Sequence, residues 1–405
     1  MNQKTALPFV EFVALMATMI ALAALSTDAM LPALQSIGED LAVARENSVQ
    51  LIISTLFLGL AVGQIAYGPV SDSVGRKPAV YAGYALFIVG CLLSIFATHF
   101  SVMLTGRLLQ GLGIAGPRSI TLALVRDEYE GRAMAQVMSF VMTVFILVPV
   151  VAPTFGQAIL LFAGWRTIFG ALLMLALLTV IWFALRQPET LSAAQRRPFS
   201  LHRLWRAIVE ICTNRIALGY TLAAGLVMGA FMGYLNSAQQ VFQGQYGLGT
   251  KFPLYFSVIA LALGGASFTN GRLVMRYGMR LLTSWAVLAL VALSTTFSLI
   301  AFIVEGHPAL LLLMIYLMAS FFCVGILFGN LNSLAMEPLG HIAGVGAAVV
   351  GSLSTLLAVP LGTLIGQGYN GTVLPLVGGF AILSLLALLV MSWAERKFTV
   401  AKSES

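Results

Sequence analysis

Long apolar runs recur along the whole chain and alternate with short polar segments. Each run holds about 20 apolar residues, which is enough to cross ~30 Å of hydrocarbon as a helix. Helices are the expected form because lipid cannot satisfy exposed backbone groups, and the ten-residue alternation of a membrane β-barrel is absent. We predict twelve transmembrane helices, near residues 9–34, 48–70, 79–97, 101–124, 133–160, 164–186, 214–240, 252–273, 281–303, 309–332, 342–368 and 372–394.

Composition supports an integral membrane protein. The chain is 59% hydrophobic and 9% charged, whereas a soluble domain carries about 25% charged residues. If both termini are cytoplasmic, 17 of the 22 Lys and Arg residues lie in inner segments and three (Arg45, Arg166 and Lys251) in outer ones. Basic residues favour the cytoplasmic side, so this is the predicted orientation. The net charge of +7 then needs no nucleic-acid partner, because the inner basic residues face an anionic leaflet.

The chain divides near its middle. Residues 188–213 form the longest polar stretch, so we predict an N-terminal bundle of six helices over 1–187 and a C-terminal bundle over 214–405 that ends in a short cytoplasmic tail. Within the linker, apolar residues recur at helical spacing from Leu201 to Cys212. This pattern fits a short helix on the cytoplasmic surface. It fits a charged lead-in to the seventh span equally well.

A weak internal repeat supports two halves. Three pairs are separated by 203 residues, namely Gly68 and Gly271, Gly75 and Gly278, and Lys77 and Arg280. Two bundles related in this way would place a binding site between them, near the bilayer midplane. The repeat fails for charge, because the partners of Asp28, Asp72 and Arg107 are Phe231, Met275 and Leu310. Charge chemistry is therefore expected in the first bundle, and shape and apolar surface in the second.

Three charged residues lie well inside predicted spans: Asp28, Arg107 and Arg118. Such a charge costs at least ~2.5–3.5 kcal/mol and indicates function by default. Asp28 and Arg107 each lie roughly 9 Å inside the outer boundary. Arg107 could pair with Asp28 directly or bias its ionisation from a distance, with desolvation acting in the opposite sense. The structural alternative is that Asp28 merely caps the outer end of a helix.

Arg118 lies deeper, beside Gly116 and Pro117. It could hydrogen-bond to backbone carbonyls freed by that proline, or it could take part in transport. Both readings are open at this point.

The loop GPVSDSVGRKPAV (Gly68–Val80) carries a second signal. Gly68 and Gly75 permit tight or positive-φ turns. Asp72 can cap a helix N-terminus or pair with a cation. Arg76 and Lys77 add cytoplasmic charge, so the loop could hold two bundles together on the inner side. The alternative is an ordinary positively charged turn.

Gly68–Val80 resembles the signature loop between spans two and three of the major facilitator superfamily. LTGRLLQGLGIAG (Leu104–Gly116) resembles that superfamily's fourth-span motif, and PVVAPTFG (Pro149–Gly156) its fifth-span antiporter motif. In the latter, Ala152–Pro153 replaces the usual Gly–Pro, and Gln157 replaces the second glycine of the closing pair. STDAMLPAL (Ser26–Leu34) and PET (Pro188–Thr190) resemble the bacterial Bcr/CflA branch of drug–proton antiporters.

This resemblance implies an all-α fold of two pseudo-symmetric six-helix bundles that alternate access by rocking, in the bacterial inner membrane. It implies that Asp28 is the proton-linked acid and Arg107 its electrostatic regulator. Gly68, Asp72, Gly75 and Arg76 would form the cytoplasmic gate motif, and Pro149, Pro153 and Gly156 would shape the fifth helix. Some relatives carry a further acid two turns before Asp28, where this chain reads TMIA. Neutral or zwitterionic cargo is therefore expected.

The seventh span supplies candidate residues for a substrate cavity. Flexible methionines and flat aromatic rings suit promiscuous apolar binding, and the candidates are Met228, Phe231, Met232, Tyr234 and Asn236. The alternative is helix packing, with the neighbouring glycines allowing close approach.

These features favour a proton-coupled exporter of small amphipathic drugs, such as chloramphenicol- or bicyclomycin-like compounds. A proton-linked importer of a small metabolite is the alternative. An enzyme or receptor is disfavoured because the four histidines are scattered and no P-loop is present. We expect no catalytic residues, no metal and no cofactor beyond the proton gradient. The expected partners are protons, a small amphipathic substrate and the lipid bilayer, and nothing demands more than a monomer.

Overall fold

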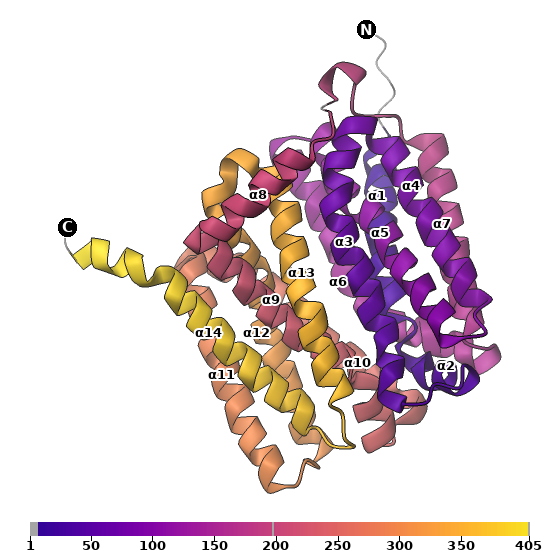
Figure 1. The fold of residues 1–405 in the computed structure, drawn as a ribbon, viewed down its shortest axis with the longest axis vertical. Coiled ribbons are helices and arrows are strands. Elements are labelled where there is room, and N and C mark those ends of the chain that lie inside the picture. Colours follow the sequence, from indigo (N-terminus) through magenta and orange to yellow (C-terminus); the bar gives the residue numbers. More distant parts are fainter. Residues whose placement is uncertain (1–6, 197, 404–405) are drawn as a thin grey trace. The chain divides into compact units, whose positions relative to one another are not determined.

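The computed structural model describes residues 7–196 and 198–403, with side chains up to residue 396. Within these residues the fold is helical and contains no β-strand (Figure 1). Eleven stretches are long and apolar enough to cross a membrane, and one of them, Leu310–Gln367, contains two long helices. The described chain therefore has twelve membrane-length helices, which confirms the predicted number.

The chain divides into two compact units, Met1–Leu201 and His202–Ser405. The helices of the first unit are α1 (Phe9–Asp28), α2 (Leu34–Asp40), α3 (Leu51–Val74), α4 (Arg76–Ile95), α5 (Phe100–Glu128), α6 (Gly131–Phe162) and α7 (Arg166–Arg186). Short 3-10 turns lie at Leu31–Ala33, Glu46–Gln50 and Ala193–Gln195. The helix α8 (Leu201–Thr213) follows and leads into the second unit.

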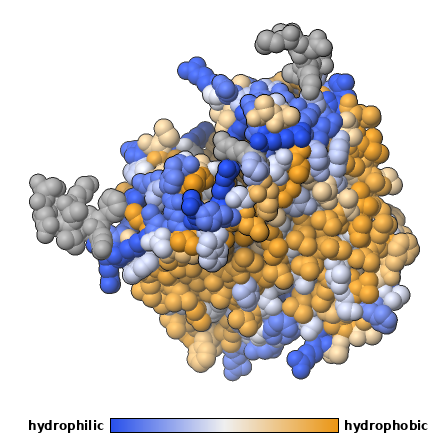
Figure 2. Space-filling model, turned by 45° about the horizontal axis from the view of Figure 1, so that its top comes forward, coloured by the Kyte–Doolittle hydropathy of each residue, from blue (hydrophilic) through white to orange (hydrophobic). Residues whose placement is uncertain are grey.

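The helices of the second unit are α9 (Arg215–Leu235), α10 (Phe252–Tyr277), α11 (Met279–Ile303), α12 (Leu310–Met336), α13 (Ala343–Gln367) and α14 (Leu374–Ser403). A short π-helix lies at Gln240–Gln245, and short 3-10 helices lie at Gly249–Lys251 and Glu337–Ile342. The surface of the molecule matches a membrane protein, because apolar side chains cover much of the face shown in Figure 2. Large apolar side chains are exposed elsewhere on the surface too; Phe162, for example, is 91% exposed.

The first helix ends at Asp28, earlier than the predicted boundary near residue 34. The backbone turns through Ala29 and Met30 before the 3-10 turn that contains Pro32. A proline has no N–H to donate, and it disfavours helical geometry in the residue before it. Asp28 is therefore the last residue of a broken helix.

The helices of the first unit pack closely where glycines remove side chains. A Cβ added to Gly59 of α3 would lie 2.2 Å from the carbonyl oxygen of Leu108, and one added to Gly111 of α5 would lie 1.9 Å from that of Leu56. Small residues let two backbones approach in this way. The α3–α5 contact therefore fixes the depth at which Arg107 lies.

The two units repeat the same packing. In the first, α1 packs on α6, α5 on α3 and α4, and α4 on α7; in the second, α9 packs on α13, α12 on α10 and α11, and α11 on α14. Gly75, between α3 and α4, has φ 109° and ψ 162°, and Gly278, between α10 and α11, has φ 78° and ψ 158°. The same turn recurs 203 residues apart, as the sequence repeat predicts.

The later part of the linker forms a helix, α8. In α8, Ala207 and Ile211 are buried, whereas Trp205 on the opposite side is 63% exposed. Of the two interpretations that the sequence left open, the structure therefore shows the helix.

Candidate functional site

Asp28 is a buried carboxylate that no described residue pairs with. Its residue is only 5% exposed, and in the described part of the chain no hydrogen bond or ion pair reaches its side chain. The neighbouring hydroxyls do not serve it, because Ser26 donates to the carbonyl of Leu22 and Thr27 to that of Ala23. A buried carboxylate with no compensating group is costly, and this cost is relieved when the group takes up a proton.

Arg107 is fully buried and fully engaged. Its Nε donates to the carbonyl of Ile52 at 3.1 Å, its Nη1 to Oε1 of Gln110 at 2.6 Å, and its Nη2 to the carbonyl of Ser26 at 2.9 Å. The guanidinium also lies 5.8 Å from the ring of Phe169. Direct pairing with Asp28 is therefore absent. Arg107 instead binds the backbone two residues before Asp28 and ties α5 to α1 and α3.

The sequence reasoning did not single out Gln110. Its side chain accepts from Arg107 and donates to Oγ of Ser94 on α4 at 3.0 Å. The sequence did carry one sign of this contact: Gln110 follows Arg107 by three residues, and residues at that spacing are neighbours on a helix surface.

Arg118 has few contacts with other described side chains. It is half-buried, and its guanidinium lies 5.8 Å from the ring of Phe145 on α6. Among the described residues it makes no hydrogen bond to a backbone carbonyl and no ion pair, so the structural alternative at Pro117 is not the arrangement found. The carbonyl of Pro117 itself accepts from Thr121.

The fifth-span motif lies against the end of α1. Ala21 and Ala24 of α1 form a buried cluster with Val148 and Ala152 of α6. Further along, a Cβ added to Gly156 would lie 1.7 Å from the carbonyl oxygen of Ala29, the residue after Asp28. Pro149 and Pro153 lie inside α6 without ending it. The glycine of this motif thus permits the closest approach of the two helices, beside the carboxylate.

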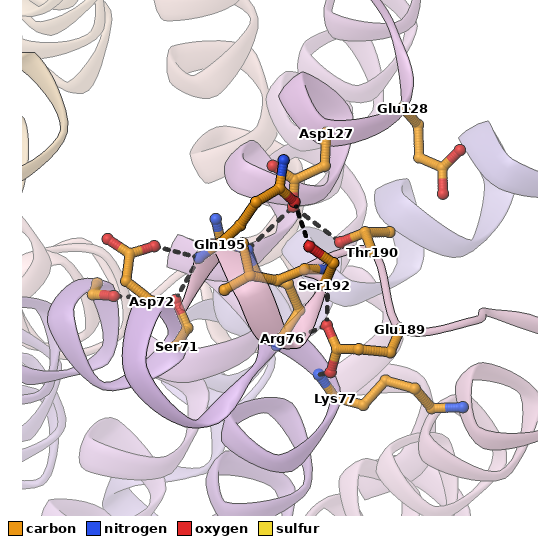
Figure 3. Close-up of polar contacts among 12 residues, drawn as sticks. Ser71, Asp72, Arg76, Lys77, Asp127, Glu128, Glu189, Thr190, Ser192 and Gln195 are labelled. Atoms are coloured by element: carbon orange, nitrogen blue, oxygen red, sulfur yellow. Dashed lines mark hydrogen bonds and ion pairs between the residues drawn. The ribbon is translucent and has the colours of Figure 1, made fainter. Parts of the chain in front are cut away.

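A second site surrounds Arg76 at the other end of the first unit (Figure 3). Gly75 begins the turn, and the buried Arg76 donates through Nη1 to Asp72 at 2.5 Å and to Oγ of Ser71 at 2.8 Å. Its Nε donates to Asp127 of α5 at 3.0 Å. The cation that pairs with Asp72 is thus Arg76, the first residue of α4. We call Ser71, Asp72, Arg76, Asp127 and Glu189 the Arg76 network.

Glu189, within the PET segment, caps α4. Its Oε1 accepts from the backbone N–H of Arg76 at 2.9 Å, and its Oε2 accepts from that of Lys77 at 3.0 Å. A carboxylate at a helix N-terminus satisfies otherwise unpaired donors and suits the helix dipole. The network therefore fastens α3, α4, α5 and the segment after α7 together.

The two glycines of this loop differ in role. Gly75 has positive φ, and a Cβ there would lie 2.7 Å from Oε2 of Glu189. The turn predicted at Gly68 is wrong, because Gly68 lies inside α3, which continues through Pro69 to Val74. A proline inside a helix removes one backbone hydrogen bond, and transmembrane helices tolerate this because neighbouring groups satisfy the freed carbonyl.

Asp127 and Glu189 were not among the predicted site residues. Two signals were available in the sequence: a carboxylate at the inner end of the fourth span, and the glutamate of the PET segment. Their pairing with the loop depends on tertiary packing.

The candidate cavity residues of α9 fall into two groups. Met228 and Phe231 are half-buried, and the ring of Phe231 contacts Phe321 and Phe328 of α12. Met232, Tyr234 and Asn236 are buried. A Cβ added to Gly362 of α13 would lie 2.3 Å from Met232, and one added to Gly366 would lie 2.6 Å from Asn236. Met232 and Asn236, the residue that follows α9, therefore pack against α13.

In the second unit Arg280, beside the Gly278 turn, pairs with Glu337 at 2.8 Å and Glu395 at 3.2 Å, and an amide pair lies in sequence register with the first unit's network. At the positions 203 residues after Tyr67 and Asp127 stand Asn270 and Asn330. Their side-chain amides exchange two hydrogen bonds, of 3.1 and 2.9 Å, and so join α10 to α12. Among the described residues, no group of three His, Cys, Asp or Glu side chains is placed to hold a metal.

The fold and these motifs agree with a match to a known family. The profile of the Major Facilitator Superfamily matches residues 16–363. The chain belongs to this superfamily. The superfamily consists of transporters, so at the family level this multi-pass membrane protein is a transporter and not an enzyme.

Its relatives include bacterial resistance proteins. It is 32% identical to an uncharacterised MFS-type transporter, YdgK, of Bacillus subtilis, over 84% of this chain and 85% of that one. It is 30% identical to a bicyclomycin resistance protein homolog of Haemophilus influenzae, over 89% and 90%, and 26% identical to multidrug resistance protein D of Escherichia coli, over 94% and 96%. These names agree with the resemblance to the drug–proton antiporter branch.

Solved structures support the fold. The human organic anion transporter MFSD10 matches with a TM-score of 0.72 at 17% identity, over 96% of this chain and 100% of that one. The xylose transporter XylE of Escherichia coli, in a partially occluded inward-open conformation, matches with a TM-score of 0.71 at 12% identity, over 95% and 97%. The predicted fold class is therefore confirmed.

Proposed function

We propose that this chain is a proton-coupled antiporter that exports small amphipathic compounds across the bacterial inner membrane by alternating access. The observation that carries the proposal is Asp28, a carboxylate in the first bundle that is buried and has no partner in the described part of the chain. The names of the resistance-protein relatives support the same direction of transport.

The coupling follows from the environment of the carboxylate. Desolvation favours the protonated acid, and hydration favours the ionised one. When Asp28 faces the outside it takes up a proton, which favours release of the cargo. When it faces the inside it loses the proton as cargo binds. The two ligands oppose each other, and this coupling is reciprocal.

Arg107 supplies a fixed positive charge in this scheme. Its guanidinium is held by acceptors on α1, α3 and α5, so it acts on Asp28 through space. The Arg76 network belongs to the cytoplasmic gate, and Met228 and Phe231 are the half-buried residues among the candidates for contact with cargo. Both termini are cytoplasmic, and the transporter works as a monomer with protons and a small molecule as its partners.

The decisive test is transport by purified protein in liposomes with an imposed pH gradient. The wild type should move drug against its gradient when the proton gradient is applied. Asp28→Asn should insert and fold normally but lose all proton-driven movement, because an amide cannot exchange a proton. Normal proton-driven transport by Asp28→Asn would refute the assignment.

A susceptibility panel in an efflux-deficient bacterium separates export from import. Wild-type protein should raise resistance to some amphipathic antibiotics, and Asp28→Asn should not. An importer of a metabolite would instead leave resistance unchanged or lower it, and would concentrate a metabolite inside the cell.

A further inference from the structure

Two opposite charges in the first unit have no partner in the described part of the chain. Of the three charged side chains deep within its spans, Arg107 is saturated by three acceptors. Asp28 has no hydrogen bond or ion pair there, and Arg118 has only the ring of Phe145. Charges at this depth usually pair or face a wet cavity. Because no described residue pairs with either charge, a ligand can supply their counter-charges.

Both charges lie along the contact between α1 and α6. Asp28 is four residues after Ala24 and seven after Ala21, so it lies on the face of α1 that carries those alanines. That face packs against Val148 and Ala152, with Phe145 at the edge of the same cluster. Arg118 lies over Phe145. The partly buried Leu25, Val144 and Phe145 edge this cluster, so an apolar strip, the Phe145 wall, lies between the carboxylate and the guanidinium.

The spacing of the two charges suits a small drug-like molecule. Gly156 lies against Ala29, next to Asp28, and Phe145, eleven residues earlier on the same helix, lies by Arg118. Eleven residues span about 16 Å at 1.5 Å per residue, and the flexible arginine side chain can shorten the gap. The two groups are thus too far apart to pair with each other, yet within reach of one ligand.

We propose that Asp28 and Arg118 are the two poles of a site for a zwitterionic amphipathic cargo. Asp28 receives its ammonium, Arg118 receives its carboxylate in a forked pair, and the Phe145 wall takes its apolar body. A ligand with only a positive charge would leave the charge of Arg118 unpaired. A ligand with only a negative charge would leave that of Asp28 unpaired. The site therefore disfavours both. The site rests on the proposed function and names the cargo class for it.

The test measures equilibrium binding to purified protein at one pH and without a proton gradient. The probes share one skeleton: a fluoroquinolone with a free amine and a carboxylate, its N-acetyl form, which is only anionic, and its methyl ester, which is only cationic. The wild type should bind the zwitterion about tenfold more tightly than either derivative.

Variants assign the two poles. Arg118→Gln should weaken zwitterion binding about tenfold and leave ester binding unchanged, with Arg118→Lys intermediate. Asp28→Asn should weaken zwitterion binding and leave binding of the N-acetyl form unchanged. The matched control is Arg126→Gln, which removes a positive charge from the exposed end of the same helix and should bind all three probes as the wild type does. Melting temperatures without ligand show that each variant folds.

The proposal is overturned if Arg118→Gln affects all three probes equally, if it affects none, or if the wild type binds none at millimolar concentration. It fails separately from the transport mechanism. Proton-driven export that needs Asp28, combined with probe binding indifferent to Arg118, would remove the site alone. Charge-selective binding without proton-driven export would remove the antiport mechanism alone.

Discussion

At the scale of single residues, the three membrane charges have different environments. Arg107 holds two backbone carbonyls and one amide, whereas Asp28 and Arg118 hold no polar group in the described residues. The charges themselves were visible in the sequence, because a charged residue in an apolar run stands out. The partners of Arg107 were not, because two of them are backbone carbonyls and every residue carries one.

Arg107→Ala should destabilise the folded protein. It would leave the carbonyls of Ser26 and Ile52 and the amide of Gln110 without their donor. Each hydrogen bond to a charged group contributes about 1.5–3 kcal/mol, and burial of the guanidinium offsets part of this, so we expect a net loss of about 2–4 kcal/mol. Thermal unfolding in detergent measures it. Arg118→Ala, on the same helix, should shift the melting temperature much less. Equal shifts would contradict the structural role given to Arg107.

Glu189→Ala should loosen the start of α4. Losing an N-terminal cap costs about 0.5–2 kcal/mol, and here two backbone donors lose their acceptors. Hydrogen exchange at the Arg76 and Lys77 amides should accelerate. The control is Glu130→Ala, an exposed acid just before α6 whose side chain makes no cap bond. Unchanged exchange in Glu189→Ala would show that the cap is dispensable.

At the scale of elements, the number and order of the helices followed from hydrophobic length alone. The break after Asp28 was not placed, because Pro32 interrupts a helix without changing its hydropathy. The position of Gly68 was misjudged because a glycine beside a proline usually indicates a turn, yet α3 continues through both. Of the predicted cavity residues, Met232 and Asn236 pack on α13. Gly362 and Gly366 of α13 lack side chains, and this lets the two residues pack closely there. Which face of a buried helix meets its neighbour is decided by tertiary packing.

Gly156→Ala should push α6 away from α1 beside Asp28. The added Cβ would lie 1.7 Å from the Ala29 carbonyl oxygen, and such overpacking costs about 1–3 kcal/mol. Proton-driven transport should fall sharply even where protein still reaches the membrane. Gly170→Ala in α7 has nothing within 4 Å and should be neutral or slightly stabilising. Comparable transport by both variants would argue against the α1–α6 contact as part of the site.

At the scale of the whole molecule, the two units share their packing pairs and their Gly75-type turn but differ in charge. The first carries Asp28, Arg107 and the Arg76 network. The second has no charged counterpart of Asp28 or Arg107 in the sequence; it has an amide pair, the ion pairs of Arg280 with Glu337 and Glu395, and a cluster of aromatic rings around Phe321. We expect proton coupling to depend on the first unit and apolar contact with cargo to depend on the second.

The most direct measurement is the release of protons when purified protein binds cargo in weakly buffered solution. The ligand would be a compound to which the wild type confers resistance. Binding should release about one proton per molecule bound from the wild type and none from Asp28→Asn, because cargo and proton compete through that one carboxyl. Equal proton release from both proteins, or cargo binding to the wild type without any release, would contradict the account.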